Sequence, residues 1–382
     1  MTRSFGYYTY PWNLHDPAGD LAAMADDGMA HVAIAASYHA GKFIQPRDPV
    51  SRVYFPEDGT VYFTPRSTRY GLLQPLRARA AEARDVLREA CDAAALQVRA
   101  WTVLNHNSRL GWLHPEVVSR NAWGDPYYYA LCPSHPEVRR YAVTLAADLA
   151  EHHDLHSLML ESPGWLVYDH GYHHEFAQAQ PTTESTRLMG LCFCDSCTVQ
   201  AGAAGIDMAG LRGEIRRQVD AQLDDTRNGE IVPPDELAAF HAWRCCIVTT
   251  LCAEIRAAVR PAVAVRVIST CQRPHATCYL EGGDLAALAQ VTDGLELPLY
   301  QPSADAVAGD LADVVAAAGS TERLSAILRP GYPDMSSEAQ LRDTLARLAA
   351  AGIDDISFYN YGLLPADQID WVRRAVHQSG GA

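Results

Sequence analysis

Short apolar runs alternate along this chain with longer segments whose apolar residues recur at helical spacing. This alternation is typical of parallel strands connected by helices. The expected strands are Gly6–Tyr10, His31–Ser37, Gln97–Leu104, Ser157–Glu161, Ala264–Thr270, Gly294–Tyr300, Leu324–Leu328 and Ile353–Tyr359. Eight such units predict an α/β fold of the (β/α)8 TIM-barrel type. The alternative, an open doubly wound sheet, lacks the expected G-x-G-x-x-G turn after its first strand.

Local signals predict some of the connecting structure. A hairpin is expected at Val53–Phe63, followed by one long helix over Leu72–Ala95, which is rich in strong helix formers. Ser134, with Glu137 three residues later, fits a capping box at the start of a helix. Ser337 is expected to cap a later helix.

The connection between the fourth and fifth expected strands is the longest in the chain. It carries a cysteine cluster, a His-rich stretch and two expected helices, near Met208–Leu223 and Pro234–Val259. No low-complexity tract or flexible linker separates it from the rest of the chain. We therefore expect a single domain, residues 1–382, with an insertion at 162–263.

The residues that close the expected strands are polar and aromatic. In TIM barrels the active site lies at the carboxyl ends of the strands. Aromatic faces suit stacking against sugar rings, and Asn, His and Gln suit hydrogen bonds to hydroxyl groups, so we expect a small carbohydrate substrate. The candidate substrate-binding residues at these ends are Tyr8, Tyr10, Trp12, His39, Asn105, His106, Trp165, Tyr300, Gln301, Arg329, Tyr359 and Asn360.

Glu161 is the first catalytic candidate. The apolar run Leu158-Met159-Leu160 precedes it, so its carboxyl group emerges from a buried strand into the expected site. Such a partly desolvated carboxyl group suits a general acid. The alternative is a glutamate that only binds a neighbouring loop.

Three cysteines stand within six residues, Cys192-Phe193-Cys194-Asp195-Ser196-Cys197. This spacing places three sulfurs within reach of one small cation, and tetrahedral zinc needs one further ligand. Cys132, in Cys132-Pro133-Ser134-His135-Pro136, is the candidate for that ligand. We expect structural Zn²⁺ as the cofactor, with unligated packing thiols as the alternative.

Cys132-Pro133-x-x-Pro136, a strand-four Glu161 and Cys192-x-Cys194-x-x-Cys197 together resemble the family 42 β-galactosidases and related barrel glycosidases, over roughly 105–197. The resemblance implies a barrel with zinc at these four cysteines and Glu161 as the acid/base. Two positions depart from the family pattern. Leu160 stands where the family has Asn, and strand seven lacks the family's nucleophilic glutamate.

Glycoside hydrolysis ordinarily uses two carboxylates that flank the scissile bond. Asp334, after the seventh strand, is the first candidate for the second group, and Asp169 is the next. Glu175 and Glu296 are weaker candidates, and Glu296 fits equally well as a satisfied group inside the barrel.

The stretch Tyr168-Asp169-His170-Gly171-Tyr172-His173-His174-Glu175 is the other unusual feature. We expect His170, His173 and His174 to contact the substrate. Imidazole and carboxylate groups also suit a catalytic metal, but the spacing fits no familiar metal signature. A metal here remains an alternative.

These features predict a glycosidase that acts on a small glycoside or oligosaccharide. A barrel lyase or isomerase on a sugar-like or polyol substrate, and a non-catalytic sugar-binding barrel, are the alternatives.

Charge and composition exclude several partners. A formal net charge of −15 and the absence of Lys/Arg runs argue against nucleic acid and anionic membranes as partners. The chain shows neither a signal-peptide pattern nor an apolar run of the roughly 20 residues that span a bilayer. We expect a cytoplasmic protein whose ten cysteines are thiols or metal ligands, and homo-oligomerisation is left open.

Overall fold

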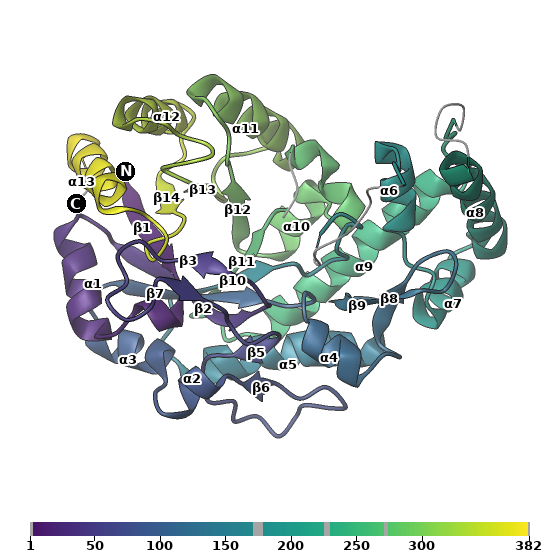
Figure 1. The fold of residues 1–382 in the computed structure, drawn as a ribbon, viewed down its shortest axis with the longest axis horizontal. Coiled ribbons are helices and arrows are strands. Elements are labelled where there is room, and N and C mark those ends of the chain that lie inside the picture. The colour runs from purple at the N-terminus through teal and green to yellow at the C-terminus, as the bar shows by residue number, and fades with distance from the viewer. Residues whose placement is uncertain (1–2, 171–178, 225–229, 271–273, 381–382) are drawn as a thin grey trace.

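The computed structural model describes residues 3–170, 179–224, 230–270 and 274–380. Eight parallel strands form a closed barrel (Figure 1). They are β1 (Ser4–Thr9), β2 (His31–Tyr38), β7 (Gln97–Val103), β10 (Ser157–Glu161), β11 (Ala264–Ile268), β12 (Gly294–Pro298), β13 (Leu324–Leu328) and β14 (Asp355–Phe358). β1 pairs with both β2 and β14, which closes the sheet. The predicted α/β TIM barrel is confirmed.

One helix after each strand completes the β/α unit. These helices are α1 (Pro17–Asp26), α3 (Val86–Ala93), α5 (Pro136–His152), α9 (Leu237–Ala258), α10 (Leu285–Val291), α11 (Ala304–Ala318), α12 (Glu338–Ala350) and α13 (Ala366–Gln378). The short strands are β3 (Phe43–Ile44), β4 (Val53–Tyr54), β5 (Thr60–Val61), β6 (Leu76–Arg77), β8 (Val118–Arg120) and β9 (Pro126–Leu131). The other helices are η1 (Pro11–Asn13), α2 (Arg79–Glu82), α4 (Ser108–Leu113), α6 (Thr183–Met189), α7 (Asp195–Ala203), α8 (Met208–Asp224) and η2 (His275–Glu281).

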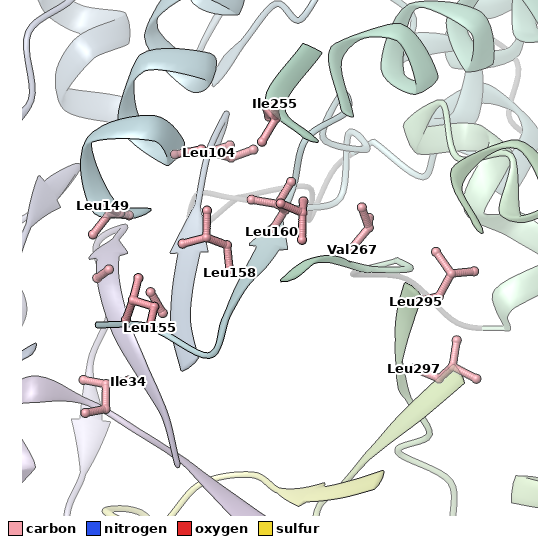
Figure 2. Packing of buried hydrophobic residues seen from close by; sticks show 14 of the residues in the cluster. Ile34, Leu104, Leu149, Leu155, Leu158, Leu160, Ile255, Val267, Leu295 and Leu297 are labelled. Carbon is pink, nitrogen blue, oxygen red and sulfur yellow. The ribbon is translucent and has the colours of Figure 1, made fainter. Parts of the chain in front are cut away.

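The strands have two different faces because successive side chains of a strand point to opposite sides of the sheet. Leu158 and Leu160 of β10 belong to the apolar layer between the barrel and its helices, together with Leu149 of α5 and Ile255 of α9 (Figure 2). Met159, between the two leucines, belongs to the separate cluster inside the barrel. Burial of each large apolar side chain stabilises the fold by about 1.5–3 kcal/mol.

The lower interior of the barrel is charged. Arg99 of β7 donates from Nη2 to both carboxylate oxygens of Asp355, each at 3.0 Å. Burial by itself raises the pKa of Asp355, but the positive charge of Arg99, with smaller contributions from His31 and Arg266, holds it at about 2. Pairing of this kind is what allows ionised groups to remain inside a closed barrel.

Glu296 of β12 lies inside the barrel without such a partner. Its side chain is buried, and it forms no ion pair within 4 Å among the described residues. Burial raises the pKa of Glu296 from 4.5 to about 7, although the charges of Arg99 and Arg266 and a weak hydrogen bond from Ser357 oppose the shift. Glu296 is therefore an interior group, as one of the two sequence interpretations expected, and its polar contacts offset the cost of burial only in part.

The connection between β2 and β7 differs from the predictions. The expected hairpin at Val53–Phe63 is wrong: β4 pairs with β3, and β5 pairs with the end of β2. The expected single helix over Leu72–Ala95 is also wrong, because β6, α2 and α3 divide this segment. The Asp85 carboxylate explains the break before α3, since it accepts hydrogen bonds from the backbone N–H groups of Arg88 and Thr64. These tertiary contacts outweigh the helix propensity of the segment.

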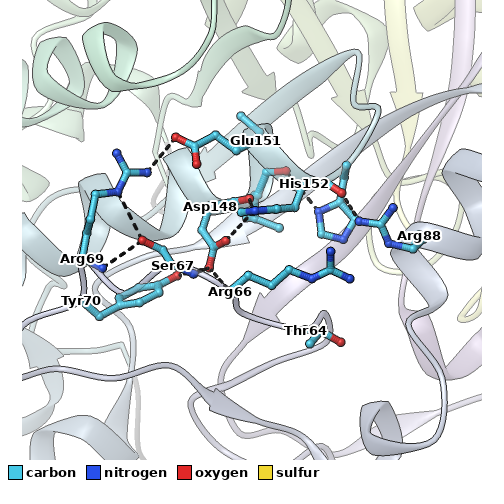
Figure 3. A network of polar contacts seen from close by, with 12 residues as sticks. Thr64, Arg66, Ser67, Arg69, Tyr70, Arg88, Asp148, Glu151 and His152 are labelled. Atoms are coloured by element: carbon cyan, nitrogen blue, oxygen red, sulfur yellow. Dashed lines mark hydrogen bonds and ion pairs between the residues drawn. The ribbon is translucent and has the colours of Figure 1, made fainter.

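A buried carboxylate fastens the same connection to α5 (Figure 3). Asp148 Oδ2 accepts the backbone N–H of Arg66 at 3.0 Å and the hydroxyl of Tyr70 at 3.0 Å. His152, one turn later on α5, lies 2.8 Å from Asp148 Oδ1. A segment with little regular structure is thus held against a barrel helix by charge-assisted hydrogen bonds.

The connection between β10 and β11 contains α6, α7, α8 and α9. The two expected helices correspond to α8 and α9, whereas α6 and α7 were not predicted. An apolar cluster of its own, with Leu188, Phe193, Ile215 and Phe240 among its members, packs this insertion. Within the described ranges, the helices lack the length and apolar character needed to cross a bilayer.

We expect Glu296→Gln to stabilise the protein at pH 8 but not at pH 4.5. The pKa of Glu296 is higher in the folded state than in the unfolded state. The contribution of Glu296 to the free energy of unfolding is therefore fully present below pH 4.5 and is lost as the pH rises through about 7. The gain at pH 8 should be about 1–3 kcal/mol in the free energy of unfolding, measured by urea denaturation. Exposed Glu322→Gln is the control. Equal stability of Glu296→Gln and the wild type at pH 8 would contradict the prediction.

Candidate active site

A cavity of about 220 Å³ opens at the carboxyl ends of the barrel strands. Its lining residues are Tyr8, Tyr38, His39, Trp101, Glu161, His170, Ile268, Thr270, Pro298, Tyr300, Ile327 and Tyr359. Glu161 is the only carboxylate among these described lining residues. Of the predicted site residues, the structure thus brings Tyr8, His39, Glu161, His170, Tyr300 and Tyr359 together.

Strand alternation turns Glu161 into the cavity. Glu161 is two residues beyond Met159, so both side chains leave β10 on its inner face. Trp101 pairs with Met159 in the strand register and therefore lies one layer below Glu161. Its indole Nε1–H donates a hydrogen bond to Glu161 Oε2. The carboxyl group is thus oriented from below and can meet a substrate from above.

The turn after Glu161 is held by the neighbouring strand. Ser162 adopts a left-handed backbone with a φ of 52°, which costs energy for a non-glycine residue. Leu104 N–H donates to the Glu161 carbonyl at 3.0 Å, and Asn105 N–H donates to the Ser162 carbonyl at 3.1 Å. The Asn105 side chain adds a bond from Nδ2 to the Pro163 carbonyl at 2.6 Å. Asn105, predicted to bind substrate, is instead buried and positions this turn.

Four tyrosines line the cavity: Tyr8, Tyr38, Tyr300 and Tyr359. Tyr10, predicted to bind substrate, is not a lining residue, and its hydroxyl bonds to those of Tyr38 at 3.1 Å and Tyr359 at 2.7 Å. Burial raises the pKa of Tyr8, Tyr10 and Tyr38 well above the usual value of 10. These phenols stay protonated at neutral pH and offer both a donor and an acceptor.

Three histidines form a cluster, of which His39 and His170 line the cavity together with Glu161. His39 stacks on His106 with 4.0 Å between ring centroids, and His170 Nε2 lies 3.3 Å from His106 Nδ1. Burial lowers the pKa of His39 to about 4 and also lowers those of His106 and His170. The rings are therefore neutral at pH 7, and each can donate and accept one hydrogen bond. His106 supports the other two rings from behind.

Other predicted substrate contacts do not line the cavity: Trp12, Trp165, Gln301, Arg329 and Asn360. Trp165 and Asn360 are each 1% exposed. Trp12 stacks on Tyr10 at 4.4 Å between centroids. Gln301 donates to a carboxylate of α11. His173, His174 and Glu175 lie outside the described residues.

The two predicted second carboxylates, Asp334 and Asp169, are not among the described residues that line the cavity with Glu161. Asp334 Oδ2 accepts a hydrogen bond from Arg329 Nε at 2.6 Å, and the Arg329 guanidinium covers the Tyr300 ring at 4.9 Å. Asp334 thus contacts the cavity through Arg329 and Tyr300. Asp169 lines a second cavity, of about 200 Å³.

Another carboxylate, Glu281 of η2, was not predicted. It accepts a hydrogen bond from Thr270 Oγ1, a lining residue, at 3.0 Å. A Cβ at Gly164 would lie 1.9 Å from the Glu281 carbonyl oxygen, so the loop after β10 needs a glycine to approach η2 this closely. No signal in the sequence links these two loops.

Sequence reasoning also missed Trp101, Ile268, Pro298 and Ile327. Trp101 and Ile327 lie inside their strands, and Ile268 and Pro298 are the last residues of theirs. The predicted site consisted mainly of the polar and aromatic residues that follow the strands. Alternation from Arg99 places Trp101 on the inner face of β7, so the period of the strand could have identified it.

Cys132, Cys192, Cys194 and Cys197 come together as predicted. Their sulfurs all lie within 4.8 Å of one another, and all four residues are buried. The Sγ atom of Cys132 lies 3.9 Å from that of Cys192, 3.6 Å from that of Cys194 and 3.4 Å from that of Cys197. Tetrahedral zinc with bonds of about 2.3 Å would separate its sulfurs by about 3.8 Å. The donor set therefore fits a tetrahedral metal ion.

The predicted capping box at Ser134 is wrong. Ser134 Oγ lies 3.1 Å from Cys132 Sγ and 3.2 Å from Cys197 Sγ, so it belongs to the sulfur cluster. His135 caps α5 instead, since its Nδ1 accepts the Glu137 N–H. A capping rule that considers only neighbouring residues in the sequence does not include the contact between Ser134 and Cys197.

The cysteine cluster is connected to the Glu161 turn through one backbone and one side-chain hydrogen bond of Asn105. Cys132 directly follows β9, and Leu131 N–H donates to the Asn105 carbonyl at 2.9 Å. The Asn105 side chain then holds Pro163. Two bonds therefore separate the metal-binding loop from the segment that carries Glu161.

No family model and no curated protein matches this sequence. Solved structures do share its fold. The PgaB (BpsB) glycoside hydrolase domain from Bordetella bronchiseptica has a TM-score of 0.64 at 15% identity, covering 100% of this chain and 99% of that one. Alpha-L-fucosidase isoenzyme 2 from Paenibacillus thiaminolyticus has a TM-score of 0.55 at 13% sequence identity, and the match covers 99% of this chain and 49% of that one. Beta-galactosidase from Bacillus circulans sp. alkalophilus has a TM-score of 0.55 at 13% sequence identity, and the match covers 94% of this chain and 50% of that one.

This chain thus spans nearly the whole PgaB domain and about half the length of the fucosidase and the galactosidase. At these identities the likeness is one of fold. The chain is similar to these three proteins in the arrangement of its strands and helices.

Proposed function

We propose that this protein is a glycoside hydrolase acting on a small glycoside or oligosaccharide. The observation that carries the proposal is Glu161, a carboxyl group oriented by Trp101 in a cavity of phenol, indole and neutral imidazole groups. Such walls can stack on a sugar ring while their polar atoms bond its hydroxyls. The fold shared with three glycoside hydrolases gives further support.

Glu161 acts in this proposal as the general acid. Its carboxyl group donates a proton to the glycosidic oxygen as the bond to the sugar breaks, and the resulting carboxylate can then deprotonate the attacking water. Trp101 Nε1–H stabilises the carboxylate after proton transfer and holds its orientation. The family 42 resemblance assigns Glu161 the same acid/base role.

We propose Asp334 as the second carboxylate, with Asp169 as the next candidate. Arg329 donates a hydrogen bond to Asp334 and covers the ring of Tyr300, which lines the central cavity. Through Arg329, Asp334 is therefore connected to the lining of the cavity that contains Glu161. A shift of Arg329 off Tyr300 when a substrate binds would bring the carboxylate of Asp334 to the cavity.

The cysteine cluster is proposed to hold structural zinc. Four buried thiolates complete a tetrahedral shell and leave no position for substrate or water, which is typical of a structural site. When bound, the ion supplies a cross-link between the loop after β9 and the start of α7. The cluster thereby supports the Asn105 bonds that fix the Glu161 turn.

A non-catalytic sugar-binding barrel is the second candidate. One observation favours it, because Glu161 is the only carboxylate among the described residues that line the cavity. Binding of intact saccharides without any turnover by the wild type would support it over hydrolysis.

Glu161→Gln should lower kcat/KM on aryl glycosides by about 10²- to 10⁴-fold, because the leaving oxygen loses its proton donor. The fold loss in kcat/KM should be larger for aryl glycosides whose phenolate leaving group is more basic, because a poorer leaving group depends more on protonation. Hydrolysis rates across a panel of aryl glycosides measure both effects. Exposed Glu184→Gln is the control and should retain wild-type rates. Unchanged turnover in Glu161→Gln would remove Glu161 from the mechanism.

Asp334→Asn should lower kcat by at least 10²-fold if Asp334 supplies the second carboxylate, whereas Asp169→Asn should lower it by less than tenfold. Added azide should restore turnover of Asp334→Asn and give a glycosyl azide, detected by mass spectrometry. Wild-type kcat in Asp334→Asn would transfer the role to another carboxylate.

Cys197→Ser should lose bound zinc, because replacing one of four thiolates weakens a structural site strongly. We expect at least a tenfold lower zinc content by elemental analysis after dialysis, together with a lower melting temperature. Cys246→Ser, which changes an exposed cysteine outside the cluster, should keep the wild-type content. Equal zinc in both variants would disprove the site.

A further inference from the structure

The second cavity, of about 200 Å³, is lined by three segments of the chain. Its described lining residues come from the loop after β10, from α6 with its C-cap, and from η2 with its N-cap. The proposed mechanism assigns no task to the side chains that α6 contributes. The cavity therefore needs an explanation of its own.

A turn after β10 separates this cavity from the central cavity, which contains Glu161. Residues 167–170 form the turn, in which the His170 N–H donates to the Val167 carbonyl at 3.1 Å. Asp169 lines the second cavity, and His170, the next residue, lines the central one. Adjacent Cα atoms are about 3.8 Å apart, so a single layer of chain divides the two cavities at this point.

The helix η2 connects the same two cavities at another place. Leu280 lines the second cavity, and the adjacent Glu281 accepts a hydrogen bond at 3.0 Å from Thr270, which lines the central cavity. The Glu281 carbonyl also accepts the Trp165 N–H at 3.0 Å, which holds η2 against the loop that follows Glu161. Two separate segments thus place the cavities next to each other.

The sizes of the two cavities suit one ligand that occupies both. They measure about 220 and about 200 Å³. Each by itself is smaller than the roughly 300–1,000 Å³ typical of small-molecule sites, whereas the two together reach that range. A ligand that fills this space is larger than one that the central cavity holds alone.

Arg187 and Asp169 give the second cavity a charged donor and a charged acceptor. Among the described residues, the ion pair of Arg187 is with Glu184, at 3.6 Å on the surface. Such an exposed pair contributes little to stability, so a ligand can engage the guanidinium at small cost. The five N–H donors of an arginine suit several oxygen atoms of one ligand.

Two threonines add acceptors to the same cavity. The Thr186 hydroxyl donates to the Thr183 carbonyl at 2.9 Å, and the Thr277 hydroxyl donates to the Pro274 carbonyl at 2.8 Å. Because each hydroxyl proton is used within the protein, each oxygen acts toward a ligand as an acceptor. Leu280 adds an apolar side chain. Donors, acceptors and an apolar group together suit a ring that carries hydroxyl groups.

We propose that the second cavity is a subsite for a sugar unit away from the bond that Glu161 cleaves, so that the substrate is an oligosaccharide. The inference rests on the proposed function and narrows it, since a monoglycoside would leave this cavity unused. Arg187 and Thr186 are then specificity-determining residues, which bind the substrate without taking part in bond cleavage.

Losses at this subsite should depend on the length of the substrate. Arg187→Met keeps a long side chain and removes the donors, so KM for an oligosaccharide should rise about tenfold, as for the loss of a hydrogen bond to a charged group. Its kcat should stay within twofold, because the interaction is equal in the ground and transition states. Kinetics on aryl monoglycosides should also stay within twofold. Thr186→Val should raise KM for the oligosaccharide by about 2- to 10-fold.

The experiment uses the full chain and β-linked oligosaccharides of glucose, galactose and N-acetylglucosamine, from two to five units long. Each series is compared with the p-nitrophenyl glycoside of the same sugar. The control is Arg216→Met, which changes an exposed arginine of α8 that lines neither cavity. Dissociation constants for the same saccharides are measured by calorimetry on Glu161→Gln, with and without Arg187→Met, so that binding is read without turnover.

The dissociation constant should fall by at least tenfold from the shortest to the longest saccharide of the preferred sugar, and Arg187→Met should remove most of this fall. Affinity that does not change with length, or equal affinity of Arg187→Met and Arg216→Met for the longest saccharide, would overturn the subsite and leave the role of Glu161 intact. If Arg187→Met does not fold, the same criterion applies to Thr186→Val.

Length-dependent binding that Arg187→Met weakens, without any turnover by the wild type, would support the subsite and overturn the proposed hydrolysis. Absence of binding to every saccharide in the three series would overturn the subsite and the proposed function together.

Discussion

Closure of eight parallel strands is the constraint on which the rest of the structure depends. Since β1 pairs with both β2 and β14, every second side chain of each strand is enclosed by the sheet itself. An enclosed polar group must find its partner within the barrel or at its rim. Arg99 and Asp355 meet this requirement as a pair, and Glu296 meets it by holding its proton up to about pH 7.

The same constraint creates the site. The inner face of β10 runs from Met159 to Glu161, where the barrel opens, so the last inward side chain of a buried strand becomes a functional group at the rim. Its orientation comes from the Trp101 indole of β7, and the turn that follows it is bonded by Asn105, two residues beyond the end of β7. A carboxyl group held from two sides loses little entropy when a substrate binds, which is how a preorganised site gains rate.

The segment that carries the cysteines supports this rim through hydrogen bonds. Leu131, the last residue of β9, precedes Cys132 and donates its backbone N–H to the Asn105 carbonyl. The Asn105 side chain in turn bonds the Pro163 carbonyl, so these contacts lead from the cysteines to the Glu161 turn. The cysteine cluster is thus linked by hydrogen bonds to the turn beside the cavity, although none of the four cysteines lines the cavity.

The sequence by itself determined the fold, the position of Glu161 at the end of its strand and the four cysteines of the cluster. The ranges of β10 and β13 were predicted to the residue, and the cysteine spacing identified the cluster, because strand period and short motifs are local properties. Ser337 was also predicted as a cap, and its side chain accepts the Gln340 N–H. Only the tertiary structure decided which strand-end residues line the cavity. Trp101 reaches Glu161 across 60 residues, and Asp85 breaks an otherwise helical segment by binding Thr64. Such contacts depend on how distant segments pack, and no local pattern encodes them.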